Sequence, residues 1–327
     1  MDNKPISCFH LGEYFQVDGK QLQQQYKDHI SNYHQWEQKE HAAEWMLFSE
    51  NVSSRLSIDE TALSNGELYT IVTNKVAKGR KGSIVAMIKG TQTEQITEVL
   101  YKIPEGLRRR VEEVTLDMAA NMVSAVRRCF QHAHMVTDRF HVQKLAYDAV
   151  QEIRINYRWE VLDKENELIA QARAQKQPYE PEVLANGDTV KQLLARSRYL
   201  LFKHHSKWTQ SQKARAELLF PKYPEIKKAY DLSMSLGKIF QTCKNKEHAF
   251  KKLALWYNEV EETGIAAFRT VSKSIQTHYV SILNYFINRS TNAAAESFNA
   301  KIKAFRATSR GVRDISFFLF RLANIYA

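Results

Sequence analysis

The order of strand-like and helix-like segments between residues 55 and 140 is the feature that most constrains the fold. Alternating apolar segments separated by turns, including the dipeptide Asn65-Gly66, predict an antiparallel meander. Later strand-like segments alternate with helical patterns, which predicts a mixed sheet with helices on its faces. The strand-like segments are 55–63, 67–73, 83–88, 111–117 and 134–138, and the helical patterns are 93–103 and 119–130.

The regions on either side of this pattern differ from it. Residues 1–18 look extended, and the loose apolar periodicity of residues 20–48 predicts a helix. From 142 to 288 no segment has a strand pattern, so we expect an all-α insertion broken at prolines and glycines. The predicted organisation is a helical lead-in over 1–50, a first core segment over 51–141, the insertion over 142–288 and C-terminal core helices over 289–327.

Charge is the most informative feature of the composition. The 327 residues have a formal net charge of +11 and a pI near 9.4, which favours a polyanionic partner, nucleic acid first and an anionic membrane surface second. The three cysteines form no CxxC pair, which excludes a zinc ribbon or a disulfide framework. No signal peptide or membrane span is evident. We therefore expect a cytoplasmic, nucleoid-associated protein.

Three carboxylates lie at positions where active-site residues are expected in a mixed sheet of this kind. Asp59 lies in the first strand, Asp117 ends the fourth, and Glu296 lies in a helical pattern near the C-terminus. Mg²⁺ and Mn²⁺ prefer oxygen ligands, and two such ions can support in-line displacement at a phosphodiester. We expect the three carboxyls to converge. Glu60 should point to the opposite face of the sheet from Asp59.

The helix that contains Glu296 has a polar stripe. Asn292, Glu296, Asn299 and Lys303 recur at spacings of four, three and four, which places them on one face. Asn292 and Asn299 are candidates for orienting Glu296 or binding phosphate. The alternative is a solvated helix face without a functional role.

Basic residues gather in two segments that are candidates for DNA contact. In residues 195–230 they are interleaved with aromatic residues, a composition that suits phosphate contacts and base stacking. A helical hairpin with core aromatics and solvated lysines is the alternative there. A second run follows Glu296, where a solvated face is again the alternative. The candidate residues are Arg196, Arg198, Lys203, Lys207, Lys301, Lys303, Arg306 and Arg310.

Five segments in order resemble the DDE transposases of bacterial insertion sequences, specifically the ISL-three family. The most specific are TDRFH at 137–141, before the helical insertion, and the Asn-x-x-x-Glu-x-x-Asn pattern at 292–299, after it. The others are LSIDETA at 56–62, TLDM at 115–118 and LLARSRYLL at 193–201.

The resemblance implies an α/β, RNase H-like domain with a mixed five-stranded sheet and a large all-α insertion before the last catalytic helix. It implies that Asp59, Asp117 and Glu296 bind Mg²⁺ or Mn²⁺ as a two-ion site for DNA cleavage and strand transfer. Asp138 and His141 match an Asp-x-x-His pair, to which we assign site support or DNA-end contact. Asp138 has the alternative role of capping the helix that begins near Phe140.

One departure from the family affects the expected partners. Members usually have an N-terminal zinc-ribbon and helix-turn-helix region, and the sequence before residue 55 has no CxxC. We expect DNA as the partner and a homo-oligomer in the synaptic complex. For end recognition three alternatives stay open: a separate DNA-binding polypeptide supplies it, the chain is truncated, or the insertion and basic helices bind DNA alone. The alternatives for function are an RNase H-fold nuclease that cuts without joining and a non-catalytic DNA-binding protein derived from a transposase.

Overall fold

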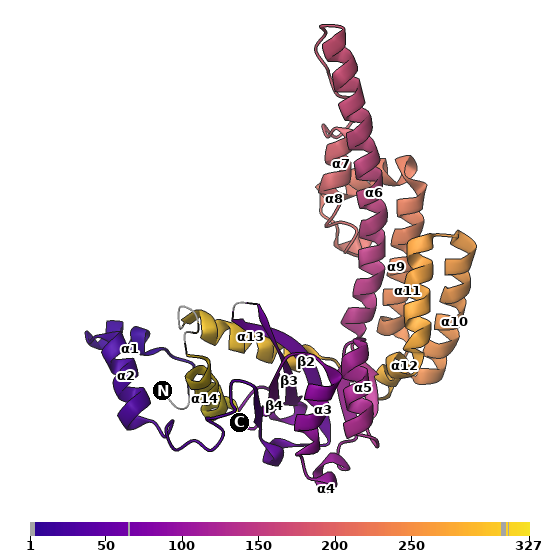
Figure 1. The fold of residues 1–327 in the computed structure, drawn as a ribbon. Helices are drawn as coiled ribbons and strands as arrows, with labels where there is room; N and C mark the ends of the chain where they lie inside the picture. Colours follow the sequence, from indigo (N-terminus) through magenta and orange to yellow (C-terminus); the bar gives the residue numbers. More distant parts are fainter. Residues whose placement is uncertain (1–3, 65, 309–311, 313) are drawn as a thin grey trace. The chain divides into compact units, whose positions relative to one another are not determined.

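The computed structural model describes residues 4–64, 66–308, 312 and 314–327, and the chain divides into two compact units. The first unit comprises residues up to Asp138 together with Asn288–Ala327, and the second comprises Arg139–Ile287. The first unit contains the sheet, and the second is built of helices (Figure 1).

The sheet of the first unit has six strands in the order β1-β4-β3-β2-β5-β6. Neighbouring strands from β1 to β2 are antiparallel, and β2, β5 and β6 run parallel. This mixed sheet with helices on its faces confirms the predicted fold class, of the RNase H-like type. The strands are β1 (Trp45–Leu47), β2 (Arg55–Ser64), β3 (Glu67–Asn74), β4 (Ile84–Lys89), β5 (Glu113–Leu116) and β6 (His134–Thr137).

The sixth strand, β1, corrects the expected count of five. It falls inside the segment 20–48 that was predicted as a helix, and it pairs antiparallel with β4. Met46 is fully buried in this strand. Pairing with the edge of β4 and burial of Met46 outweigh the local helical pattern, a common tertiary override of propensity.

The N-terminal region differs from expectation in a second way. Residues Cys8–Phe15 form helix α1 rather than an extended segment, and α2 (Gly19–Gln25) continues into a π-helical turn that ends at Ile30. The Ser7 hydroxyl accepts a hydrogen bond from the His10 amide and caps α1.

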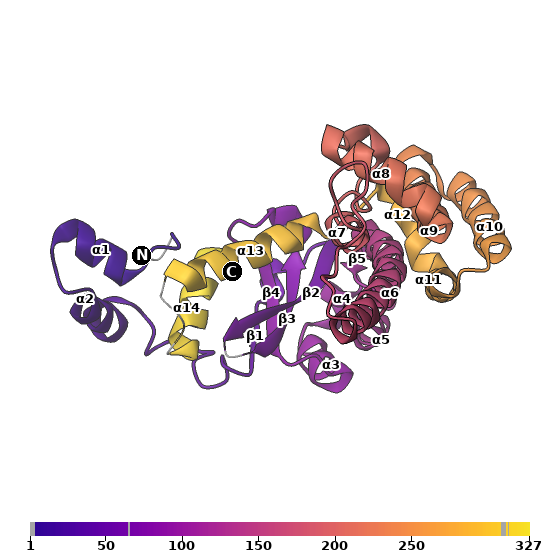
Figure 2. The ribbon, with the colours of Figure 1, turned by 90° about the horizontal axis from the view of Figure 1, so that it is seen from above.

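Helices cover both faces of the sheet (Figure 2). On one face the apolar side chains of α3 (Thr93–Tyr101) and α5 (Ala120–Cys129) join Leu56 and Ile58 in a buried core. On the other, α13 (Ala293–Thr308) and α14 (Ile315–Tyr326) bury aromatic side chains such as Phe298. A short helix, α4 (Glu105–Arg108), follows α3. The layer that contains Glu296 therefore lies on the opposite face from α3 and α5.

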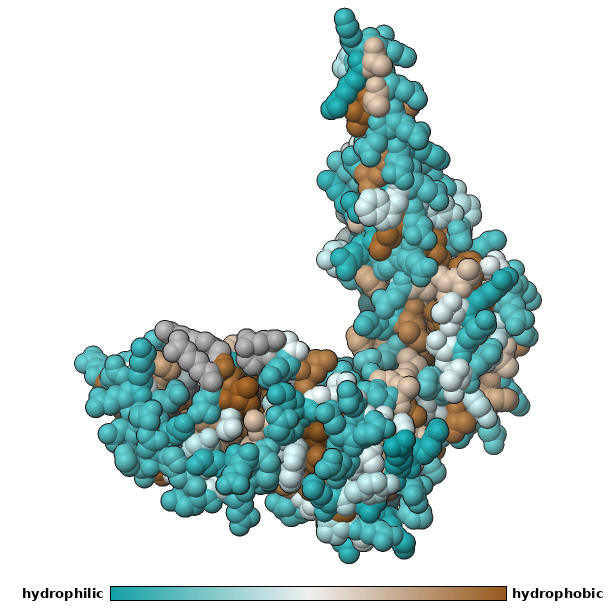
Figure 3. All heavy atoms as spheres, viewed as in Figure 1, coloured by the Kyte–Doolittle hydropathy of each residue, from teal (hydrophilic) through white to brown (hydrophobic). Residues whose placement is uncertain are grey.

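The second unit contains no named strand within Arg139–Ile287, all of which is described, and has a single isolated bridge between Val183 and Thr189. Trp256 and Phe268 are fully buried in its core. On the face shown in Figure 3, apolar patches appear among its packed helices. The helices are α6 (Arg139–Ala174), α7 (Val190–Arg196), α8 (Gln210–Lys222), α9 (Pro224–Thr242), α10 (Lys246–Thr263), α11 (Ala266–Thr277) and α12 (Tyr279–Asn288). Within the described residues, no helix is long and apolar enough to cross a membrane.

Candidate active site

Strand β2 presents different chemistry on its two faces. Leu56 and Ile58 belong to the apolar core under α3 and α5. The alternate residues face α13: the Ser57 hydroxyl donates to the Asn292 side-chain oxygen, and Asp59 is bonded by Asn299. Side chains alternate along a strand, so Glu60 falls on the α5 side, where Asn121 hydrogen-bonds its carboxylate. This confirms that Asp59 and Glu60 point to opposite faces.

Asp59 is half-buried and held by two donors. Its Oδ2 accepts a hydrogen bond from the Asn299 amide at 2.8 Å, and its Oδ1 accepts from the Glu60 backbone N–H at 2.9 Å. Asn299 is thereby the residue of α13 that fixes where the Asp59 carboxylate lies.

Asp117 follows the last residue of β5. The parallel pairing matches Leu56 with Val114 and Ser57 with Thr115, and Asp59 and Asp117 each lie two residues beyond this last pair. Asp117 Oδ1 accepts from the Ala119 N–H at 2.8 Å, just before α5. Burial, and then the charges of Asp117 and Asp59, raise the pKa of Glu60. Negative charge is therefore concentrated at this end of β2 and β5.

Glu296 lies in the first turn of α13, and its side chain is exposed. It precedes Asn299 by three residues, which is about one helical turn. Among residues 4–64, 66–308, 312 and 314–327, no group of three His, Cys, Asp or Glu side chains lies close enough to hold a metal ion. The expected convergence of the three carboxyls is thus not seen. Instead, Asp59 and Asp117 each accept a hydrogen bond from a neutral donor nearby.

The polar stripe predicted for α13 is divided between two environments. Asn292 is fully buried and Asn299 is 6% exposed, whereas Glu296 and Lys303 are exposed. Phe298, Ile302 and Phe305 are buried as expected. The solvated-face interpretation is therefore wrong for the two asparagines, which reach inward to β2 because Ser57 and Asp59 offer them partners.

The segment that leads into α13 is fastened to three strands by buried polar groups. Asp138, which follows β6 and is 2% exposed, accepts a hydrogen bond from the Asn292 N–H. Ser57 of β2 bonds the Asn292 side chain, and Glu113 of β5 accepts from Asn288 Nδ2 at 3.1 Å. These bonds set where α13 begins and therefore where Glu296 and Asn299 lie.

A buried ion pair supports the same edge of the sheet and was missed by sequence analysis. Lys75 Nζ lies 2.6 Å from the Thr115 hydroxyl and 3.3 Å from Glu113 Oε1, and both charged side chains are largely buried. Burial tends to raise the pKa of Glu113, but bonds from Ser290 and Asn288 and the charge of Lys75 hold it below its usual value. A glutamate that opens a short apolar strand, Glu113 before Val114, was the available signal.

Comparison with known proteins gives the family. A family model described as a transposase, the ISL-three type of DDE transposase, matches residues 56–322. The chain belongs to this transposase family. The match includes Asp59, Asp117 and Glu296, and it spans both the sheet and the helical insertion.

Two individual proteins are similar to the chain. The transposase for insertion sequence element IS1001 of Bordetella parapertussis is 22% identical over 269 residues, covering 82% of this chain. The chain spans 59% of the length of that relative. The Drosophila P element transposase strand transfer complex aligns with a TM-score of 0.35 and 12% identity, over 84% of this chain and 77% of the other.

The DNA-contact candidates of the first unit have varied surroundings. Lys301 Nζ donates to the Gly79 carbonyl oxygen at 2.9 Å, in a turn that also contains Lys78 and Lys81. Lys303 is exposed and Arg306 is half-buried. Arg310 lies outside the described residues.

The candidates of the second unit separate into paired and unpaired cations. Arg196 and Arg215 both bind the carboxylate of Asp188, which is 2% exposed. Arg198 lies over the Tyr199 ring, 5.6 Å from its centroid, while Lys203 and Lys207 are exposed. His141 is half-buried in the first turn of α6.

The aromatic residues of this segment also differ in their roles. Trp208 packs against Phe220 and Tyr230, and its indole N–H donates to the Leu200 carbonyl at 2.8 Å. Trp208 therefore fits the core interpretation rather than base stacking. Tyr199, in contrast, is 65% exposed.

Proposed function

We propose that this chain is the catalytic part of a DDE transposase, which cleaves DNA at insertion-sequence ends and joins the freed 3′-hydroxyl to target DNA. Membership of the transposase family supports this assignment. The observation that carries it is the parallel pairing of β2, which contains Asp59, with β5, which precedes Asp117, together with the bond to Asp59 from Asn299 on the helix of Glu296. DNA is the proposed substrate, in keeping with the net charge of +11.

The residues present fit a divalent cation in their donor chemistry. Asp59, Asp117 and Glu296 supply carboxylate oxygens, and the buried Asn299 Oδ1 atom, beside Asp59, has no hydrogen-bond partner among the described residues. Hard cations prefer such oxygen donors. We propose that these three acids would hold two Mg²⁺ or Mn²⁺ ions, which would activate the attacking hydroxyl or water and stabilise the leaving oxygen.

The other residues of the site would position these acids and the DNA strand. Asn299 orients Asp59, and the bonds from Asp138 and Ser57 to Asn292 fix the start of α13. We assign phosphate contact to Lys303 and Arg306, which follow Glu296 on the same helix. His141 remains a proposed site-support or DNA-end residue. A homo-oligomeric synaptic complex and a separate end-binding polypeptide also remain proposals.

A strand-transfer assay on insertion-sequence end DNA with Mg²⁺ tests this function. Wild-type protein should yield joined product, and Asp59→Ala, Asp117→Ala and Glu296→Ala should each abolish it. Glu98→Gln, an exposed acid on α3, is the matched control and should retain activity. Cleavage without joining would establish the nuclease alternative. DNA binding with no cleavage by wild type would establish the non-catalytic alternative.

A further inference from the structure

A stripe of polar side chains on α6 faces α7 inside the second unit. Gln151, Arg154 and Arg158 are spaced at i, i+3 and i+7, which aligns them on one helix face. Arg154 Nη1 donates to the Leu194 carbonyl of α7 at 2.9 Å, and the whole Arg154 residue is 6% exposed. The guanidinium of Arg154 is therefore buried between the two helices.

A third arginine joins this stripe from the segment that follows α7. Gln151 accepts from Arg154 Nε at 2.7 Å through its oxygen and donates to the Arg198 carbonyl at 3.3 Å through its nitrogen. The Arg198 side chain is exposed and lies over the Tyr199 ring. Solvent exposure within the cluster therefore increases from the buried Arg154 to the exposed Arg198, and the cluster is open to solvent at Arg198.

These three arginines have no carboxylate counterpart within the described residues. None of Arg154, Arg158 and Arg198 forms an ion pair there, and the buried Arg158 Nε atom has no hydrogen-bond partner in that part of the chain. Burial lowers the pKa of Arg154, and the like charges of Arg158 and Arg198 lower it further. A guanidinium stays protonated in proteins, so the site retains uncompensated positive charge.

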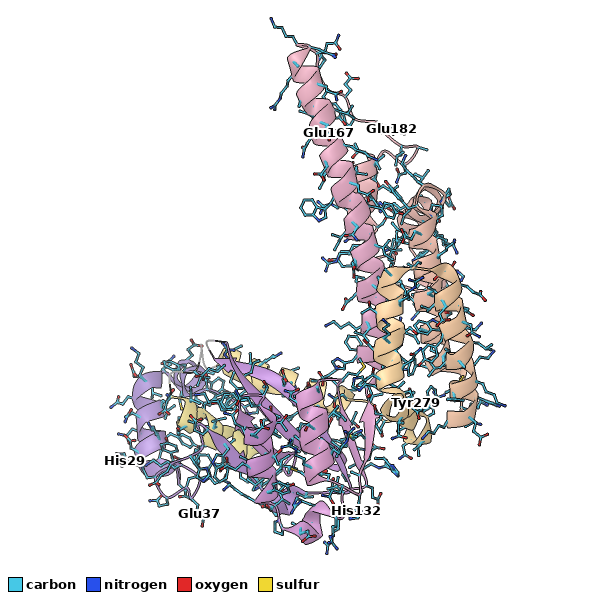
Figure 4. All side chains as sticks on the ribbon, turned by 45° about the vertical axis from the view of Figure 1, so that its right-hand side comes forward. His29, Glu37, His132, Glu167, Glu182 and Tyr279 are labelled. Carbon is cyan, nitrogen blue, oxygen red and sulfur yellow. The ribbon has the colours of Figure 1, made fainter. Side chains whose placement is uncertain are left out.

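Arginines near the cluster differ from its members because they pair with a carboxylate. Arg196, two residues before Arg198, pairs with the buried Asp188, which Arg215 also binds. The labelled acids of this region, Glu167 and Glu182, lie toward the outer end of α6 (Figure 4). Glu167 is nine residues beyond Arg158, which is about 14 Å along the helix axis. Acids are thus available in this unit but do not neutralise the cluster.

We propose that Arg154, Arg158 and Arg198 form a phosphate-binding site for a DNA strand on the insertion, with Tyr199 as the stacking platform for an adjacent base. This proposal rests on the proposed function for its ligand. A buried charge without a counter-charge is costly, and a phosphate oxygen would supply that counter-charge through charge-assisted guanidinium bonds. The exposed ring of Tyr199 suits base stacking, which tolerates any sequence.

The first experiment measures phosphate binding by the full chain without any DNA. Thermal unfolding is followed in EDTA as inorganic phosphate replaces chloride at constant ionic strength. The midpoint should rise with phosphate concentration in the wild type, and this rise should be smaller in Arg158→Gln and Arg198→Gln. Arg173→Gln, an exposed arginine farther along α6, is the matched control and should behave as wild type. An equal rise in all four proteins would overturn the proposal.

The second experiment asks whether the phosphate belongs to DNA. Binding of a fluorescent single-stranded oligonucleotide is measured in EDTA at several salt concentrations. Arg158→Gln and Arg198→Gln should each reduce the slope of log K against log salt by about 0.7, the value for one phosphate contact on single-stranded DNA. If the phosphate response is lost but this slope stays unchanged, the cluster binds only free anions and the DNA assignment falls.

Both readouts are independent of cleavage, so they separate this proposal from the proposed function. An inactive chain that still shows the two responses would retain the arginine site and lose the catalytic assignment. Arg198→Gln changes an exposed side chain, so a folding failure at the buried Arg154 does not affect the test.

Discussion

The two faces of strand β2 are built for different purposes. Under α3 and α5, Leu56 and Ile58 sit in a closely packed apolar core that fixes the strand by burial alone. Under α13, Ser57 and Asp59 bond asparagine side chains that come from more than two hundred residues away in the sequence. One face therefore supplies stability that many apolar residues share. The face under α13 depends on a few specific polar pairs, which fix the positions of the acidic side chains.

This difference predicts how each face should respond to substitution. Loss of an apolar side chain should lower stability by a modest amount and leave the chemistry in place. Loss of a polar partner should either leave a buried charge uncompensated or move a carboxylate.

The largest effect is expected at the buried pair of Lys75 and Glu113. Replacing Lys75 with Met leaves the Glu113 carboxylate buried without its cation, and breaking such a pair costs about 3–5 kcal/mol of unfolding free energy. Urea denaturation measures this loss. The double variant Lys75→Met/Glu113→Gln removes both charges and should recover most of the stability. A single variant as stable as wild type would show that the polar face does not depend on this pair.

The next effect is expected at Asp117. Asp117→Asn preserves the side-chain shape and the bond from the Ala119 N–H, but it removes the negative charge of the carboxylate. Loss of one preorganised electrostatic group should reduce DNA cleavage at least on the order of 100-fold. Gel-based cleavage rates measure the change, and urea denaturation should show near-normal stability. Wild-type cleavage by this variant would exclude Asp117 from the catalytic set.

The succession of strands β2 to β6 along the chain, and which residues of β2 share a face, were predictable from local sequence. Alternation and turn dipeptides mark β2, β3 and β4, and the same alternation separates Asp59 from Glu60. The position of Asp117 after a strand was predictable too. These features depend on neighbours within a few residues, so the sequence contains the information directly.

What the sequence could not reveal depends on contacts between distant segments. Strand β1 exists because β4 offers it an edge. The asparagines of the α13 stripe are buried because Ser57 and Asp59, on the face of the sheet that α13 covers, bond them. Helical periodicity gives which residues share a face but not whether that face meets polar partners or water.

A smaller effect is expected at Asn299, a positioning residue for Asp59. Asn299→Leu keeps the branching of the side chain at Cγ and removes the 2.8 Å bond to the carboxylate. Outer partners of this kind are worth about 10–100-fold in activity or metal affinity. Cleavage should fall within that range, and the Mg²⁺ concentration for half-maximal activity should rise.

Magnesium dependence separates positioning from simple destabilisation. If Asn299→Leu unfolds more easily but requires the same Mg²⁺ concentration as wild type, Asn299 serves the fold and not the carboxylate. Asn299→Gln retains an amide, so partial recovery of the Mg²⁺ requirement would support the positioning role.

The smallest effect is expected on the apolar face, one residue before Asp59. Ile58 is 1% exposed in the core under α3 and α5, and Ile58→Val removes one buried methyl group. The expected loss of unfolding free energy is about 0.5–1.5 kcal/mol, with cleavage per folded molecule unchanged because the side chain points away from α13. Urea denaturation and cleavage rates measured on the same preparation test both parts. If cleavage fell as far as in Asn299→Leu while the protein stayed folded, the two faces would be coupled. The assignment of stability to one face of β2 and of carboxylate positioning to the other would then be wrong.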